Sequence, residues 1–388
     1  MEIDLQLRLG ERLRCSIGSD EPYWALVPKS LPPLDLRLDD IQLLVEKASQ
    51  ALGRLDGLST VLPNTQLFLY MYVRKEAVLS SQIEGTQSSL SDLLLYESAE
   101  APGVPLHDVQ EVSNYVAAMN YGLERLRDGF PISLRLIREL HAVLMQGVRG
   151  GGKSPGEFRR SQNWIGGSGP ASAHHVPPPP DKVLDCMSEL EKFIHNRAER
   201  LPILIRVALV HHQFETIHPF LDGNGRLGRL LITLLLCESG VLSAPILYLS
   251  LYFKENRQEY YQHLQQVRET GDWESWLRFF LEGVIEVAQQ ATLAARDILA
   301  LVQADRAKIA EVGRSAGSAL QVFNYLEKKP LALIPEMVAA LKLTTPTVTA
   351  ALQNLIRLEI VQEVTGKQRG RIFVYQGYMR VLERGIDA

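Results

Sequence analysis

The sequence predicts a mainly α-helical protein that ends in a small module of different character. Between breaks rich in proline and glycine, apolar residues recur three and four positions apart, which is the spacing of one helix face. A length of 388 residues and a hydrophobic content of 46% allow two or three domains with cores of their own. Towards the C-terminus the spacing changes to alternation, which is typical of strands. We therefore expect a helical body followed by a mixed module.

The helices of the body can be placed from this spacing. A long one is expected from about Asn64 to Ser81, where Leu67, Met71 and Val78 share a face. From Gly283 to about Val312 the chain is rich in alanine and forms helix readily, so it is expected to link the body to the C-terminal module. Further helices are expected over residues 108–126, 133–145, 180–196, 202–214, 225–239 and 254–269.

The net charge excludes few classes of partner, and the scattered cysteines favour a reducing compartment. A formal net charge of −4 gives no overall signature of nucleic-acid binding, although a small basic module can be hidden in that average. Cys15, Cys186 and Cys237 are scattered without C-x-x-C spacing, which argues against a disulfide framework or a zinc site. The N-terminal segment carries acids, and the apolar patch at 230–237 is too short for a bilayer. We expect a cytoplasmic protein without signal peptide or membrane span.

The densest chemistry lies between His218 and Arg229, in the sequence HPFLDGNGRLGR. Gly223 and Gly225 lack a Cβ, so the backbone there can turn sharply and direct successive N–H groups to one point. The next residues, 226–237, are apolar at helical spacing, and the positive end of that helix dipole adds to the attraction for an anion. This stretch predicts a phosphate-binding turn.

The side chains around the turn suit a polyphosphate. Arg226 and Arg229 lie three apart in the first helical turn, where both can donate bidentate hydrogen bonds. Asp222 is a hard oxygen ligand suited to Mg²⁺, and His218 titrates near neutrality and can act as general base on a hydroxyl. Each residue alone has an ordinary structural explanation, but all of them fall within twelve residues in an order suited to phosphoryl or nucleotidyl transfer. The segment is neither a G-x-x-x-x-G-K-[ST] phosphate loop nor a dinucleotide fingerprint.

This segment resembles the signature of the Fic (filamentation induced by cAMP) family, H-x-F-x-[D/E]-G-N-G-R-x-x-R, and matches every fixed position. The resemblance implies that His218 deprotonates the target hydroxyl, Phe220 anchors the loop and Asp222 binds Mg²⁺. It also implies phosphate binding by Gly223, Asn224, Gly225, Arg226 and Arg229. The related Doc kinases and phosphocholine transferases depart from this pattern, so the complete match favours AMP transfer from ATP.

Two further segments are similar to parts of the same family. Residues 158–167 and then Val176 to Pro180 resemble its flap, a β-hairpin that holds the target as an added strand, although an ordinary proline-rich loop is the alternative. The resemblance assigns target docking to Val176 and Pro177, and nucleotide binding to Ile165, Gly166 and Gly167. The extra residues 169–175 leave the register of the hairpin open. Tyr260 and Tyr261 resemble the tyrosine that packs on adenine, or else belong to the core.

A second motif stands at the end of the long N-terminal helix. Ser80 and Glu84 are four residues apart, on one helix face, and Gly85 follows. They resemble the inhibitory motif [S/T]-x-x-x-E-[G/N] of the family, in the arrangement where the inhibitory helix precedes the catalytic core. A Glu84 carboxylate paired with Arg229 would occupy that guanidinium and repel the γ-phosphate. The motif therefore predicts autoinhibition.

The C-terminal residues predict three helices and two strands. Helices are expected around Val322 to Leu326, over 334–341 and over 345–358, with strands at 360–364 and 371–375. This order resembles a winged helix-turn-helix. The third helix presents Thr344, Thr345 and Thr347 at its start and Gln353, Asn354 and Arg357 along it, while the wing carries Lys367, Arg369 and Arg371. Winged folds also dock proteins, so DNA and protein remain alternative partners.

These patterns divide the chain into four parts. Residues 1–105 are expected to form an N-terminal helical region with the inhibitory helix, 106–285 a Fic core, 286–313 a helical linker and 314–388 the winged module. The leading interpretation is an ATP- and Mg²⁺-dependent protein adenylyltransferase that acts on a protein hydroxyl, its own included, with homodimerisation left open. The alternatives are a nucleotide-sensing transcriptional regulator, or a Fic enzyme that uses another nucleotide or removes AMP.

Overall fold

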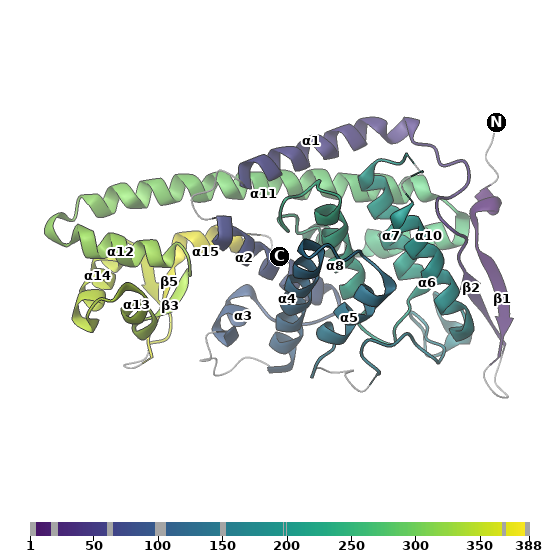
Figure 1. The fold of residues 1–388 in the computed structure, drawn as a ribbon, viewed down its shortest axis with the longest axis horizontal. Helices are drawn as coiled ribbons and strands as arrows, with labels where there is room; N and C mark the ends of the chain where they lie inside the picture. Colours follow the sequence, from purple (N-terminus) through teal and green to yellow (C-terminus); the bar gives the residue numbers. More distant parts are fainter. Residues whose placement is uncertain are drawn as a thin grey trace.

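The computed structural model describes residues 5–16, 22–59, 65–97, 106–147, 153–196, 198, 200–366 and 370–384. These residues are mainly helical, with two small antiparallel sheets (Figure 1). The helices of the body are α1 (Gln42–Ser59), α2 (Thr65–Ile83), α3 (Leu90–Glu97), α4 (Leu106–Arg127), α5 (Leu134–Leu144), α6 (Pro180–His195), α7 (Ile203–Ile217), α8 (Asn224–Glu238), α9 (Ser250–Glu255), α10 (Arg257–Thr270) and α11 (Trp273–Ala310). The C-terminal elements are α12 (Ala316–Leu326), β3 (Leu331–Leu333), α13 (Ile334–Leu341), α14 (Thr345–Arg357), β4 (Val361–Glu363), β5 (Ile372–Tyr375) and α15 (Gln376–Glu383).

Most expected helices are present, and their ends have identifiable causes. The Ser133 hydroxyl accepts the Leu136 N–H at 3.3 Å, so α5 begins where a capping residue predicts it. The single helix expected over 254–269 is instead divided into α9 and α10, which meet at Asn256. The alanine-rich helix begins earlier than expected, because Asp272 caps α11 by accepting the Ser275 N–H.

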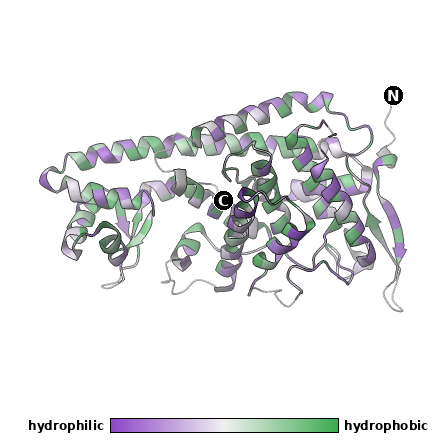
Figure 2. Ribbon diagram, in the orientation of Figure 1, coloured by the Kyte–Doolittle hydropathy of each residue, from purple (hydrophilic) through white to green (hydrophobic). Residues whose placement is uncertain are grey.

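α11 contacts helices of both the body and the C-terminal module. α1 packs along it, and α11 continues beyond the body to the C-terminal module (Figure 1). Hydrophobic and hydrophilic residues alternate along α11, the pattern of a helix that packs on one side (Figure 2). The expected linker is thus the second half of one helix that starts within the body.

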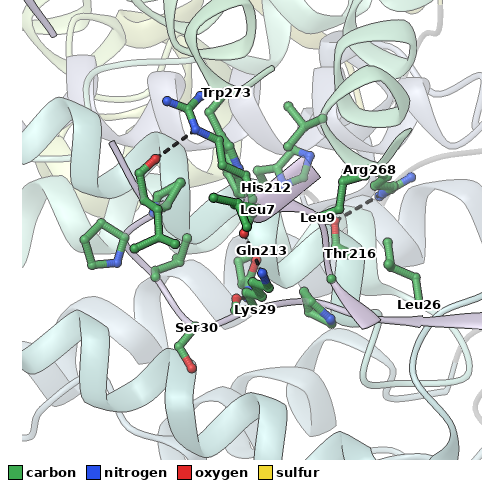
Figure 3. A pocket seen from close by; sticks show the side chains of 18 residues that line it. Leu7, Leu9, Leu26, Lys29, Ser30, His212, Gln213, Thr216, Arg268 and Trp273 are labelled. Carbon is green, nitrogen blue, oxygen red and sulfur yellow. Dashed lines mark hydrogen bonds between the residues drawn. The ribbon is translucent and has the colours of Figure 1, made fainter. Parts of the chain in front are cut away.

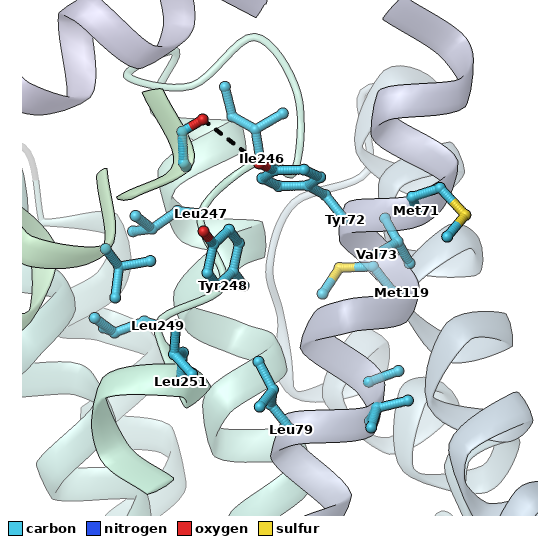
Figure 4. Packing of buried hydrophobic residues seen from close by; sticks show 14 of the residues in the cluster. Met71, Tyr72, Val73, Leu79, Met119, Ile246, Leu247, Tyr248, Leu249 and Leu251 are labelled. Atoms are coloured by element: carbon cyan, nitrogen blue, oxygen red, sulfur yellow. Dashed lines mark hydrogen bonds between the residues drawn. The ribbon is translucent and has the colours of Figure 1, made fainter. Parts of the chain in front are cut away.

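The core fixes α2 relative to the centre of the body. Figure 4 shows Tyr72 of α2 beside Tyr248, with ring centroids 5.1 Å apart, and the neighbouring residues 246–251 packed on the same side. α7 and α8 form the middle of the core, and all residues of α7 from Leu204 to Ile217 are buried. The end of α2 is thereby held next to the start of α8.

An N-terminal hairpin was not predicted. β1 (Glu11–Cys15) and β2 (Tyr23–Val27) pair antiparallel, with Leu13 opposite Ala25. In β1 the half-buried Leu13 and Cys15 alternate with the exposed Arg12 and Arg14, but this alternation spans only four residues and is a weak period-two signal. The hairpin lies at the edge of the body, beside the segment that precedes α6 (Figure 1).

The C-terminal elements comprise four helices and a three-stranded sheet in the order β3-β5-β4. The first strand and α15 were not predicted. Asn354, expected on an exposed helix face, is buried and donates to the Ser315 hydroxyl at 3.0 Å, so its expectation as an exposed reader of DNA is wrong. Lys367 and Arg369 lie outside the described residues.

α15 returns from this module to the body. The Lys75 ammonium of α2 donates to the Arg384 carbonyl at 2.7 Å, and the Ser91 hydroxyl of α3 donates to Glu383 at 2.7 Å. Cys15, Cys186 and Cys237 are free thiols. Across the described ranges, every helix is too short or too polar to cross a bilayer.

Candidate active site

The candidate site is built on the connection between α7 and α8. His218 follows α7 in the left-handed conformation, with φ of 48°, and its N–H donates to the Phe214 carbonyl. Gly223 precedes α8, also left-handed, with φ of 75°. The two turns connect one buried helix to the next through residues 218–223, and the first residues of α8, whose N–H groups have no partner within the helix, line a cavity.

Aromatic stacking between Phe220 and His141 holds this loop against α5. The buried Phe220 ring stacks on the His141 imidazole of α5, with centroids 3.8 Å apart and planes 5° from parallel. His141 Nδ1 accepts the Gly156 N–H at 2.8 Å, so its Nε2 carries the proton and donates to the Asp222 carbonyl at 3.0 Å. Phe220 lies in the core as the sequence predicted, whereas His141 was missed.

Hydrogen bonds from the preceding segment hold the same loop. Arg159 donates to the His218 carbonyl at 2.9 Å, and the Asn163 amide donates to the His218 and Phe220 carbonyls at 3.1 and 2.9 Å. The Asn224 side chain closes the turn by exchanging two bonds with the Phe220 backbone. The sequence predicts Arg159 and Asn163 only as part of the flap, because nothing in their spacing indicates that they contact the loop.

His218 is suited to accept a proton. Its side chain is 21% exposed, and Nδ1 has no hydrogen-bond partner among the described residues, although Glu215 Oε2 lies 3.9 Å away. Burial and the guanidiniums of Arg268 and Arg159 lower the pKa of His218 to about 4. Figure 3 shows Arg268 where the N-terminal segment packs on α7 and α10, and there it donates to Thr216 at 3.1 Å. The imidazole is therefore neutral at pH 7.

Asp222 is the carboxylate that suits a metal ion. Its Oδ1 accepts the Gly223 N–H at 2.7 Å and its Oδ2 contacts the Lys153 ammonium at 3.2 Å. Mg²⁺ binds through one or two carboxylates together with phosphate oxygens and water. Within the described ranges no group of three or more metal-ligating side chains is present. Asp222 fits an ion of this kind, with phosphate oxygens and water as the remaining ligands.

A cavity of about 1030 Å³ opens at the start of α8, large enough for a nucleotide. It extends from the His218 loop to the turn after α2 and the start of α4. A Cβ at Gly225 would lie 2.2 Å from Glu84 Oε1, so a larger residue there would displace the end of the Glu84 side chain. The lining includes Glu84, Gly85, His107, Asp108, Glu111, Lys153, His218, Asp222, Gly223, Asn224, Gly225 and Arg226.

The two arginines of α8 each contact one carboxylate. Arg226 donates to Glu111 of α4 at 2.9 Å. Arg229 donates through Nη2 to Glu84 at 2.5 Å and to the Ser80 carbonyl at 2.9 Å, and through Nε to the Ser80 hydroxyl at 2.9 Å. Glu84 lies in the turn just after α2, and Gly85 follows with φ of 101°. Ser80 and Glu84 thus both reach Arg229 within one chain.

Charge compensation accompanies the contact with Glu84. Burial alone would raise the pKa of the Glu84 carboxyl, but the Arg229 guanidinium outweighs burial and lowers it. Glu84 is therefore ionised at neutral pH.

Comparison with known proteins gives the family. Residues 42–124 match the family described as Fic/DOC family N-terminal, and residues 131–236 match the Fic/DOC family. The chain belongs to the Fic/DOC family over these two segments. All twelve residues of the His218 loop and the start of α8 fall inside the second segment.

Curated relatives of this Fic protein are named protein adenylyltransferase Fic. The relative from Drosophila yakuba is 30% identical over 301 residues, which are 72% of this chain and 57% of the relative. The relative from Aedes aegypti is 32% identical over 208 residues, which are 52% of this chain and 38% of the relative. The chain spans about half the length of the curated relatives it matches.

Solved structures share the fold. A Fic family protein from Desulfovibrio desulfuricans has a TM-score of 0.59 at 21% identity, covering 89% of this chain and 98% of that chain. Fic-1 from C. elegans has a TM-score of 0.51 at 22% identity, covering 66% of this chain and 74% of that chain. The Fic fold is therefore present, in agreement with the sequence prediction.

The two tyrosines near the Fic site differ. Tyr260 is buried against Phe253 and Trp276, and its hydroxyl contacts His211 Nε2 at 2.9 Å, so it is a core residue. Tyr261 is 41% exposed, with its ring 5.2 Å from that of Tyr260. Of the two, only Tyr261 presents its ring to solvent.

The flap segment is paired at a single position. Ile165 and His175 exchange backbone hydrogen bonds at 2.9 and 3.2 Å, and a short helical turn at Pro170–Ser172 lies between them. Gly166 and Gly167 adopt φ of 72° and 69° after the bridge, and with Ile165 they stand outside the lining of the large cavity. The expected hairpin is thus reduced to one bridge.

The N-terminal hairpin packs on Val176, in the second part of the flap segment. Leu26 of β2 donates to the Val176 carbonyl at 2.9 Å, and Val176 is buried against Tyr23 and Ala25. The next carbonyl, that of Pro177, accepts from Gln162 at 3.0 Å. The two residues expected to dock a target are therefore already engaged within the chain.

Proposed function

We propose that the chain is a protein adenylyltransferase, which transfers AMP from ATP to a serine, threonine or tyrosine hydroxyl of a protein. The observation that carries the proposal is the convergence of a neutral His218, the Asp222 carboxylate and the start of α8 on one nucleotide-sized cavity. The name of the curated relatives supports it, over the part of their length that this chain matches.

The residues take roles that fit this reaction. His218 accepts the proton of the target hydroxyl, whose oxygen attacks the α-phosphorus while pyrophosphate leaves. The N–H groups of Gly223, Asn224 and Gly225 bind phosphate oxygens at the positive end of α8, and Arg226 and Arg229 bind the terminal phosphates. Asp222 holds Mg²⁺, which when bound neutralises phosphate charge. Tyr261 contacts the base.

We propose further that Glu84 inhibits this reaction. Three donor contacts of Arg229 go to Ser80 and Glu84, so the guanidinium is not available to a γ-phosphate. The ionised carboxylate would also repel that phosphate at close range. ATP then binds in an unproductive pose until the end of α2 moves.

The docking edge is better assigned to Trp164 than to Val176 and Pro177. Because Ile165 directs its N–H and carbonyl at His175, its neighbour Trp164 directs its backbone to the opposite edge. Trp164 is also 40% exposed. A target strand added at this edge would lie beside the His218 loop, which Asn163 supports.

Intact-protein mass decides between this function and its alternatives. We expect Glu84→Gly, incubated with ATP and Mg²⁺, to gain the mass of one AMP group, and Glu84→Gly with His218→Ala to gain none. A gain with another nucleotide alone would identify a different transferase. No gain with any nucleotide, on the chain itself or on host proteins, would favour the nucleotide-sensing regulator or an enzyme that removes AMP.

We also propose that residues 314–388 form a winged helix-turn-helix module that binds a partner, DNA or protein. The order of α12, α13 and α14 before the strands β4 and β5 supports it. Of Gln353, Asn354 and Arg357 in α14, Asn354 is buried and accepts a hydrogen bond from Arg357. Gln353 is exposed and is not part of this contact, so the case for base reading by α14 is weakened. Filter binding to random DNA across a salt series tests the DNA role, since retention without salt dependence would exclude it.

A further inference from the structure

Glu111 contacts an arginine of the proposed site much as Glu84 does, but from a different kind of position. It lies in the second turn of α4 and accepts from Arg226 Nη1 at 2.9 Å. Its side chain is 14% exposed, whereas that of Glu84, in the turn after α2, is 37% exposed. Glu111 thus lies within a helix of the body, whereas Glu84 lies in the turn that follows a helix.

The Arg226 guanidinium depends on this contact. It is 4% exposed, and its Nε has no partner among the described residues. Its Nη2 donates to Met145 Sδ at 3.6 Å and lies 3.8 Å from Asp222 Oδ1. Glu111 is therefore the nearest opposite charge to a buried cation, which would otherwise be uncompensated and would reorient towards Asp222 or solvent.

We propose that Glu111 is a positioning residue, which holds the Arg226 guanidinium at the phosphate end of the cavity so that ATP meets it already oriented. This inference rests on the proposed function. It gives the two carboxylates opposite roles: Glu84 competes with phosphate for Arg229, whereas Glu111 binds Arg226 from the side of α4 while Arg226 still lines the cavity.

The test measures ATP binding without chemistry. Calorimetric titration with ATP and Mg²⁺ is made on Glu84→Gly with His218→Ala, and then with Glu111→Gln or Glu111→Ala added. We expect Glu111→Ala to weaken ATP binding about ten-fold and Glu111→Gln less, because glutamine keeps an acceptor but loses the charge. Glu124→Gln, an exposed position on the same helix, is the matched control and should leave binding unchanged.

A double-mutant cycle shows whether the effect passes through Arg226. In Arg226→Ala, adding Glu111→Gln should cause no further loss of ATP affinity. With His218 restored, the Glu111 variants should raise KM for ATP while kcat stays within about two-fold, a split that general destabilisation does not produce. Should Glu111→Ala fail to fold, Glu111→Gln carries the test.

Two results would overturn the proposal. Unchanged ATP affinity in both Glu111 variants would show that Arg226 needs no positioning. Faster AMP transfer by Glu111→Gln with Glu84 intact would make Glu111 a second inhibitory residue. If Glu84→Gly binds ATP but transfers no AMP, the proposed function fails, while the effect of Glu111 on affinity can still be read.

Discussion

The Glu84 carboxylate lies 2.5 Å from the Arg229 guanidinium, in the same chain and across the start of α8. The contact joins the end of α2 to the helix that begins the proposed phosphate site. Because residues 71–80 of α2 are buried while Glu84 stands in the turn beyond the helix, a small displacement of that turn would free Arg229. The proposed inhibition and the proposed phosphate binding therefore involve the same side chain, that of Arg229.

Replacing Glu84 should raise AMP transfer in two steps. Glu84→Gln keeps a hydrogen-bond acceptor but removes the charge, and Glu84→Gly removes both. A hydrogen bond to a charged group contributes about 1.5–3 kcal/mol, so we expect a rise of about ten- to one hundred-fold for glycine and a smaller one for glutamine. Initial rates of label transfer measure both. Equal rates for the wild type and both variants would remove Glu84 as the inhibitory group.

The pH profile should show an unusually weak base. The pKa of His218 is lowered to about 4, below the ordinary 6.5 of histidine, so the imidazole stays deprotonated as pH falls from 7 to 5. We expect kcat/KM of Glu84→Gly to be flat on its acid side down to about pH 5. A base with an ordinary pKa would lose activity about ten-fold per pH unit below 6.5, and such a fall would contradict the assignment.

Asn163 should matter for turnover more than for ATP binding. Asn163→Ala removes two hydrogen bonds to the His218 and Phe220 carbonyls, while the start of α8 keeps its own support from Asn224. We expect kcat of Glu84→Gly to fall by at least about ten-fold, because misplacing a base by about 1 Å is costly, with KM for ATP little changed. A larger rise in KM than fall in kcat would show that Asn163 supports the nucleotide instead.

Stability should depend on pH through Glu76. This buried carboxyl of α2 accepts from Ser250 and Tyr115, and burial raises its pKa to about 7 from an unfolded value near 4.5. The folded state keeps the proton between these values, so the stabilisation present below pH 4.5 is lost as pH rises to 7. Glu76→Gln cannot lose a proton. Its free energy of unfolding relative to the wild type should increase between pH 5 and 8 in urea titrations, and a constant difference would contradict the pKa.

The sequence reveals the chemistry of residues that are neighbours along the chain, and little of what depends on distant contacts. The residues from His218 to Arg229 could be read together because helix ends and glycine turns are local features. His141, Arg159, Asn163 and Glu111 come from other elements, and only the fold brings them to the loop. Their residue types alone are equally common on solvated surfaces.

Burial decides what the sequence left open. Tyr260, for which adenine binding and a place in the core were alternatives, is covered by neighbouring elements, and Asn354 is covered in the same way. Strands β1 and β2 were missed because each is only five residues long and the alternation in β1 spans only Arg12 to Cys15. Val176 was assigned to a target on the basis of the flap alone, without the strand that occupies its carbonyl.

The most direct test of AMP transfer uses ATP labelled at one phosphate. Glu84→Gly is incubated with Mg²⁺ and ATP that carries label at the α-phosphate or, separately, at the γ-phosphate, and protein-bound label is counted. The account predicts that label from the α-phosphate becomes attached to protein, that label from the γ-phosphate does not, and that His218→Ala abolishes the attachment. Attachment of the γ-label instead would show phosphoryl transfer and contradict the account.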